Sequence, residues 1–193
     1  MAKRNYEFRP DKTQAGLLNK LYMTPQQRLA ALRWVLYAIL LVVVSVIQDV
    51  ILCKISIFGA TTDLVPCVII LICVELGAEK TAIFSLIAAL LYKFSGTSAG
   101  YYVIALIPIL GLLASVARSS IFRKTLSSTM LCACIALFLY EASVFAFGLL
   151  FQNTSLFRGI RFAVTAGLSL LTYPIFYPLI TAIERIGEKT WKN

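Results

Sequence analysis

Two acidic residues stand inside long apolar segments of this chain, where an acid is most costly. Glu141 lies midway along one apolar run, and Asp49, preceded by Gln48, lies near the end of another. An ionised carboxylate deep in a bilayer is penalised by roughly several kcal/mol, so such residues face other helices, pair with a partner or stay protonated. We expect Glu141 to do one of these, and Asp49 to reach Lys54 or Arg161.

These acids permit two interpretations. They belong either to an ion or proton pathway, or to structural hydrogen bonds between helices or with a partner helix. We favour the structural interpretation, because a relay needs several such residues and the two acids form no catalytic constellation. The chain contains no His, which removes the commonest general base and metal ligand. Without an activated nucleophile pattern, we expect no enzyme, cofactor or metal site.

The cysteines are distributed in a way that favours packing over chemistry. None of the five forms a Cys-x-x-Cys pair, and Cys132 and Cys134 point to nearly opposite sides of a helix. We expect buried thiols that behave as small hydrophobic side chains. The five are Cys53, Cys67, Cys73, Cys132 and Cys134.

Composition indicates that these residues sit in an all-α integral membrane protein. Of 193 residues, 60% are hydrophobic and 14% charged, with a mean hydropathy of +0.84. A soluble domain has about 45–50% apolar and about 25% charged residues. The apolar residues form long runs that predict about six membrane-spanning helices. The predicted helices are 25–53, with its second half in the membrane, 63–76, 79–94, 100–117, 128–151 and 160–183.

Local signals mark the starts of two of these helices. Thr24 suits an N-cap, Pro25 the first helical position, and Gln27 completes a capping box. Asp63 is the predicted N-cap of the second helix, with Pro66 in its first turn. The second and third helices reach only roughly 20–25 Å, against a hydrocarbon core of about 30 Å. They either cross a locally thinned bilayer or form a re-entrant hairpin buried in protein.

Two parts of the chain are distinguished by charge. Residues 1–33 form a basic segment, in which Leu17, Leu18, Leu21 and Tyr22 share a helical face; this predicts either a short interfacial helix or a solvated tail. Residues 34–193 form one membrane domain. Of the 18 Lys and Arg residues, the predicted outer loops hold only Lys54, Lys93, Arg158 and Arg161. The positive-inside rule therefore predicts both termini in the cytoplasm.

Small residues and prolines follow helical spacing. Small-residue faces let helix backbones approach closely, either within one chain or at a docking surface. The faces are Ala78, Ala82, Ser85 and Ala89; Gly111 and Ser115; and Gly159, Ala163 and Gly167. Pro174 and Pro178 should kink the last helix and free carbonyl groups that need partners, so this part is expected to face protein.

From about Trp34 to the C-terminus the chain resembles the MreD family of rod-shape-determining bacterial membrane proteins. The likeness is carried by Asp63-Leu-Val-Pro66 in a short second helix and by the Ser95-Gly96-x-x-x-Gly100 turn. The basic turn from Arg118 to Lys124 and the pair Tyr173-Pro174 complete it. The family usually places an Asp four residues before Gly96, where this chain has Tyr92, followed by Lys93.

The resemblance implies a non-catalytic scaffold in the bacterial plasma membrane. Family members bind the single-span protein MreC and help to link MreB filaments to the peptidoglycan synthases of the cell-elongation complex. Their fold is similar to the six-helix substrate-binding subunit of energy-coupling-factor vitamin transporters. On this basis Arg118, Arg123 and Lys124 are candidate contacts for cytoplasmic partners or lipid, Asp49 and Glu141 are candidate polar links to a neighbouring helix, and Tyr92 and Lys93 mark the interface.

Two other functions remain open. The runner-up is the vitamin-binding transporter subunit itself. That family carries an Ala-x-x-x-Ala pair on its first helix, whereas this chain has only Ala38 between Val35 and Cys53. The third is a small proton-coupled transporter centred on Glu141, although no inverted repeat of the kind that such folds show is visible. A nucleic-acid partner is not expected, since the chain carries no motif for one.

Overall fold

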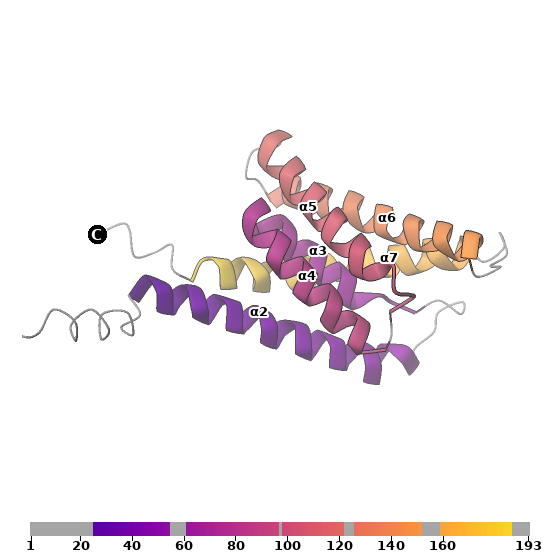
Figure 1. Ribbon diagram of the computed structural model, residues 1–193, viewed down its shortest axis with the longest axis horizontal. Helices are drawn as coiled ribbons and strands as arrows, with labels where there is room; N and C mark the ends of the chain where they lie inside the picture. The colour runs from indigo at the N-terminus through magenta and orange to yellow at the C-terminus, as the bar shows by residue number, and fades with distance from the viewer. Residues whose placement is uncertain (1–24, 55–60, 97, 122–125, 152–158, 187–193) are drawn as a thin grey trace, which may run out of the picture.

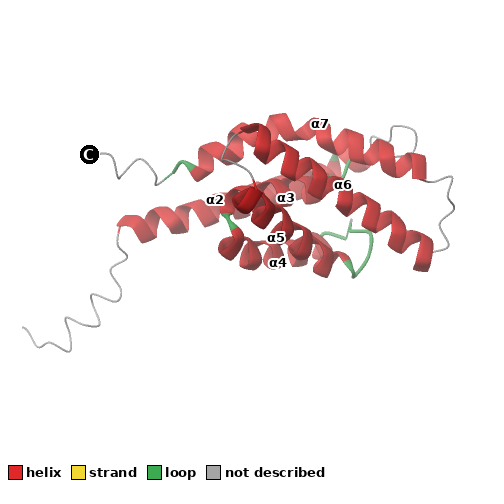
Figure 2. Ribbon diagram, turned by 90° about the horizontal axis from the view of Figure 1, so that it is seen from above, coloured by secondary structure: helices red, strands yellow, loops and turns green. Residues whose placement is uncertain are grey.

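A computed structural model describes most of the chain as a bundle of helices (Figures 1 and 2). The described residues are 25–54, 61–96, 98–121, 126–151 and 159–186. All regular structure in them is helical. The α helices are α2 (Pro25–Val50), α3 (Leu64–Leu76), α4 (Ala78–Phe94), α5 (Val103–Ile121), α6 (Leu126–Phe151) and α7 (Gly159–Glu184), and a 3-10 turn, η1 (Leu52–Lys54), follows α2.

The helices begin and end close to the positions that the sequence predicts. α2 starts at Pro25, although Thr24 and the predicted interfacial helix lie outside the described residues. Gly77 alone connects α3 to α4, with φ +79° and ψ 157°, a conformation essentially reserved for glycine. Gly96 follows α4 with φ +84°, and its backbone N–H donates to the carbonyl oxygen of Lys93 at 3.3 Å. Ser95 and Gly96 thus form the C-terminal cap of α4.

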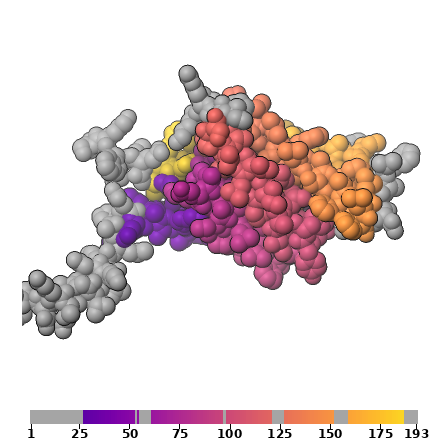
Figure 3. All heavy atoms as spheres, turned by 45° about the horizontal axis from the view of Figure 1, so that its top comes forward, coloured from indigo at the N-terminus to yellow at the C-terminus, as the bar shows by residue number. Residues whose placement is uncertain are grey.

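Four helices, α2, α5, α6 and α7, are long and apolar enough to cross a membrane. α3 and α4 are shorter, at 13 and 17 residues. Large apolar side chains are exposed along the long helices and α4, among them Val42, Ile83, Ile109 and Phe138. Figure 3 shows one such face, formed mainly by α4, α5 and α6. An outer surface of this kind suits lipid, and the fold is that of an α-helical membrane protein.

The central element of the bundle is α3. Every residue from Leu64 to Glu75 is buried, and α3 contacts α2, α4, α5, α6 and α7. Both ribbon views place it in the interior (Figures 1 and 2). This position accounts for its sequence, because a helix that is apolar on all sides is stable only where every side is covered.

The small-residue faces divide into inner and outer ones. On α5, Gly111 lies against Cys73 of α3; a Cβ added at Gly111 would be 3.0 Å from the Cys73 sulfur. On α4, Ser85 and Ala89 are buried as predicted, but Ala82 is exposed. On α7, Ala163 and Gly167 are exposed, and nothing lies within 4 Å of a Cβ added at Gly167. At the start of α7, by contrast, a Cβ added at Gly159 would lie 3.3 Å from the Phe145 ring of α6. The α7 face is therefore used for packing within the chain at Gly159 and is left open at Ala163 and Gly167.

Two prolines lie inside α7, where the sequence predicts a kink. α7 continues through Pro174 and Pro178 to Glu184. Both prolines are exposed, whereas Tyr173, the residue before Pro174, is buried. The prediction that this part faces protein is therefore right for Tyr173 and wrong for the proline side chains, since a helix turns each residue by about 100°.

Candidate functional site

One end of the bundle holds an ion pair between buried side chains. The Nη2 atom of Arg118 on α5 lies 3.0 Å from the Oε2 atom of Glu75 on α3, and the two side chains are only 12% and 6% exposed. Arg118 also donates through Nη1 to the carbonyl oxygen of Val74 at 2.6 Å. Because the last carbonyls of a helix lack intrahelical partners, the arginine both pairs with Glu75 and caps α3.

Two more charged residues complete this arrangement. Arg33 of α2 donates through Nη2 to the carbonyl oxygen of Ile186 at 2.8 Å, just beyond α7. Glu184 of α7 lies close enough to Glu75, Arg33 and Arg118 to interact electrostatically with them. We call these four residues the charged cluster. They join α2, α3, α5 and α7, and they comprise two basic and two acidic side chains.

The opposite end of α3 is fastened by Gln48. Its Oε1 atom accepts a hydrogen bond from the backbone N–H of Val65 at 2.8 Å, and Gln48 is buried. The predicted N-cap, Asp63, does directly precede α3, but its side chain makes no capping hydrogen bond. The Asp63 backbone N–H donates instead to Ser169 Oγ on α7 at 3.2 Å. The cap of α3 thus comes from a neighbouring helix.

Further polar contacts tie α7 to α3 and α6. The Cys67 thiol donates to the carbonyl oxygen of Ser169 at 3.3 Å, and the Tyr173 hydroxyl donates to the carbonyl oxygen of Ala133 at 2.8 Å. The four cysteines whose side chains are described are free, with Cys67, Cys73 and Cys132 buried and Cys134 half-buried, as expected for thiols used in packing.

A second group of polar side chains lies in the interior near the start of α3. Tyr92 of α4 and Tyr140 and Glu141 of α6 are buried, and each interacts electrostatically with Asp63. We call these four residues the interior polar cluster. The hydroxyls of Tyr92 and Tyr140 lie close enough to interact with each other, and the Oε1 atom of Glu141 has no hydrogen-bond partner in the described part of the chain.

Glu141 also lies at the bottom of a groove between α6 and α7. The groove has a volume of about 180 Å³, and Glu141 is 3% exposed. α6 contributes Phe138, Glu141, Ala142 and Phe145 to its lining. α7 contributes Gly159, Phe162, Ala163 and Ala166. Of the three alternatives expected for Glu141, burial against other helices is the one that the structure shows. Glu141 is also the single ionisable residue in the lining of this α6–α7 groove.

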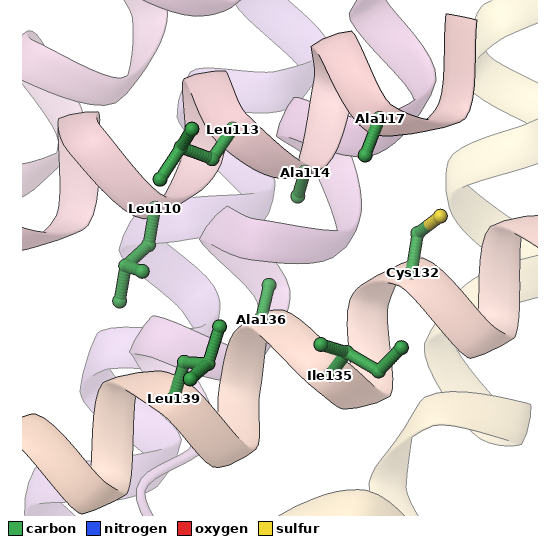
Figure 4. A pocket seen from close by; sticks show the side chains of 8 residues that line it. All are labelled: Leu110, Leu113, Ala114, Ala117, Cys132, Ile135, Ala136 and Leu139. Atoms are coloured by element: carbon green, nitrogen blue, oxygen red, sulfur yellow. The ribbon is translucent and has the colours of Figure 1, made fainter. Parts of the chain in front are cut away.

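A second groove separates α5 from α6. Its volume is about 240 Å³, and its walls are Leu110, Leu113, Ala114 and Ala117 of α5 with Cys132, Ile135, Ala136 and Leu139 of α6. Figure 4 shows these side chains meeting from the two helices. The lining offers no charged side chain and no strong hydrogen-bonding group, so it can accept only apolar matter such as acyl chains.

The remaining predicted residues are scattered. Asp49 is exposed, and within the described residues it pairs with neither Lys54 nor Arg161. The Lys93 ammonium lies 4.3 Å from the ring centroid of Tyr101, a cation–π contact. Tyr92 is in the core, 1% exposed, where it cannot mark a surface. Arg123 and Lys124 lie outside the described residues.

Sequence reasoning missed the charged cluster, although a signal for it was present. Glu75 stands at the end of the most apolar helix of the chain, and such an acid needs a cation nearby. Arg118 was assigned to partner or lipid contact because it begins a basic turn, yet the structure commits it to Glu75. The sequence also gave no sign that Gln48 is buried while its neighbour Asp49 is exposed.

Comparisons of the chain with protein-family models, with curated proteins and with solved structures return no match.

Proposed function

We propose that this chain is a non-catalytic scaffold subunit of the bacterial cell-elongation complex, held in the plasma membrane by six crossings with both termini in the cytoplasm. Its partner is an MreC-like single-span protein, and through it MreB filaments and peptidoglycan synthases. The resemblance to the MreD family supplies the biological setting. The observation that supports a scaffold is the way the interior polar groups are used.

Four polar side chains in the interior hold helices together. Gln48 joins α2 to α3, Arg118 joins α5 to α3, Arg33 joins α2 to the end of α7, and Tyr173 joins α7 to α6. In each of these contacts the bonded side-chain atom has a partner within the protein and is therefore not available to a substrate. A rigid bundle built in this way suits a subunit that presents fixed outer surfaces to other proteins.

The six crossings are supported by the placement of the two ends of α3. Asp63 lies beside Ser169 and near Gln48, whereas Glu75 lies beside Arg118 and near Arg33. α3 therefore extends from a polar region around Asp63 to a second polar region around Glu75, and α4 returns from the second region. With both helices crossing, the charged cluster and the basic segments fall on the cytoplasmic side.

The alternative is the substrate-binding subunit of a vitamin uptake transporter. One observation favours it: the interior polar cluster gathers two hydroxyls and a carboxyl oxygen near one end of the bundle. Such convergent polar groups are what a small-molecule site requires. Against it, Tyr92 and Tyr140 are themselves fully buried, so their rings fill the space that a vitamin would occupy.

Affinity purification from the native membrane tests the proposal. The tagged chain is extracted in mild detergent, and co-purifying proteins are identified by mass spectrometry. We expect a single-span MreC-like protein and wall synthases. The Glu75→Ala variant should lose them because the bundle loosens, while Glu79→Ala, which alters an exposed acid four residues later, should retain them. Recovery of coupling and ATPase subunits, or of a bound small molecule without wall proteins, overturns the scaffold and favours the transporter.

A further inference from the structure

The α6–α7 groove combines two independent features that single it out on the membrane-facing surface. Its α7 wall is built from small residues, with Gly159 and Ala163 one helical turn apart. Its floor carries the carboxyl of Glu141, 3% exposed. The α5–α6 groove, of similar size, has no such group, so the carboxyl requires an explanation of its own.

The carboxyl of Glu141 lacks a hydrogen-bond donor. Its Oε1 atom is buried and has no partner among the described residues. Leaving a buried acceptor unsatisfied is unfavourable, and more so where the group is charged. No other residue that lines the groove carries a side-chain donor. A donor supplied from outside the chain, entering through the groove, would remove this cost.

The α7 wall is shaped for a helix. Gly159, Ala163 and Gly167 recur every four residues, and the last two are exposed. A Cβ added at Gly167 meets nothing within 4 Å, whereas one added at Gly159 would lie 3.3 Å from the Phe145 ring. The open part of the strip is therefore Ala163 and Gly167. Small residues at this spacing let a second helix approach closely enough for backbone contact and interhelical hydrogen bonds.

We infer that the α6–α7 groove receives a membrane-spanning helix of another protein, and that this helix carries a Ser, Thr, Asn or Gln side chain level with Glu141. The hydroxyl or amide of that side chain donates to the carboxyl of Glu141, and the partner backbone packs on Ala163 and Gly167. The inference rests on the proposed function, since it assigns a docking position to the single-span partner.

The chemistry of the lining argues against a second copy of this chain as the occupant. A two-fold dimer would place the same groove on both sides of the interface. Each copy would then offer the other a carboxyl in place of a donor, because the remaining lining residues are apolar: Phe138, Ala142, Phe145, Phe162, Ala163 and Ala166. Two ionised carboxyls facing each other repel, and the lining of the second copy contains no hydroxyl or amide side chain that could donate to Glu141.

Site-specific photo-crosslinking in native membranes tests this position. A benzophenone amino acid is introduced at Ala163 in the groove and, as the matched control, at Ile83, which is 63% exposed on α4. We expect a crosslink from Ala163 to the single-span partner and none from Ile83. A crosslink between two copies of this chain, a crosslink to lipid alone, or partner capture only at Ile83 overturns the inference.

Three variants separate chemistry from folding. Glu141→Leu removes the acceptor, and loss of one hydrogen bond should lower partner recovery about ten-fold. Glu141→Gln keeps an acceptor oxygen and should retain recovery near the wild-type level. Ala163→Leu fills the groove from an exposed position and should block docking while leaving the thermal midpoint of the purified protein unchanged.

The outcomes distinguish this inference from the proposed function. If Glu141→Leu and Ala163→Leu both recover the partner at the wild-type level, the docking position is wrong and the scaffold proposal stands. If the wild-type chain recovers no wall-synthesis partner at all, the scaffold proposal fails and this inference fails with it.

Discussion

The side-chain oxygen of Gln48 accepts a hydrogen bond from the backbone N–H of Val65 at 2.8 Å, across a separation of 17 residues. The bond places an acceptor from α2 at the first turn of α3, where N–H groups have no partner within the helix. Asp49, the next residue, is exposed. The two neighbours therefore make a matched pair for mutation.

Replacing Gln48 with Ala should destabilise the bundle by about 1–3 kcal/mol, because the Val65 N–H is left buried without an acceptor. Asp49→Ala should change stability by less than about 0.5 kcal/mol, as for most surface substitutions. Thermal unfolding of the two purified variants in the same detergent measures the difference. Equal losses would show that Gln48 does not cap α3.

The pair formed by Arg118 and Glu75 should behave as a coupled unit. Glu75→Ala or Arg118→Ala alone leaves one charge buried without its partner and should cost about 3–5 kcal/mol. The double variant removes both charges and should be more stable than the sum of the single losses predicts. A double-mutant cycle on chemical or thermal unfolding measures this coupling, and strict additivity would contradict the ion pair.

The space around two glycines predicts opposite effects of a larger side chain on the stability of the protein. Gly111→Leu forces carbon against the sulfur and Cβ of Cys73, which a Cβ alone would approach to 3.0 and 3.3 Å. Overpacking of this kind costs about 1–3 kcal/mol. Gly167→Leu meets open space and should fold as the wild type does. Expression level and thermal midpoint in detergent compare them, and a tolerated Gly111→Leu would mean that α3 and α5 can separate.

The orientation is testable by cysteine labelling of intact cells. In a Cys53→Ser background, Lys54→Cys should react with a membrane-impermeant maleimide from outside, because the positive-inside rule places this position externally. Lys80→Cys, also exposed, should react only after the membrane is permeabilised. Labelling of both positions from the same side would rule out six crossings with cytoplasmic termini.

Helix positions were predictable because their signals are local. Pro25 at the first position of α2 and the glycines after α3 and α4 act through backbone geometry within a few residues. The apolar runs likewise predicted every described helix to within a few residues. Such information is contained in short stretches of sequence and does not depend on what surrounds them.

Pairing between helices was not predictable in the same way. Asp63 has the residue type and position of an N-cap, but Gln48 from another helix takes that role. Arg118 belongs to a basic turn in sequence and to an ion pair in space. The side of α7 that faces outward also depends on the arrangement of the other helices. The sequence therefore could not decide whether Ala163 and Gly167 pack within the chain or form a docking surface.

The complete burial of α3 has a consequence for biosynthesis. Its contacts with Ser169 join residues 106 and 102 positions apart, and at about 5–20 residues per second the ribosome needs roughly 5–20 s to make that intervening chain. Until α7 emerges, Asp63 and Cys67 have none of these partners. A nascent chain that stalls before α7 is thus left with an uncovered central helix, which is the kind of surface that membrane proteases and chaperones recognise.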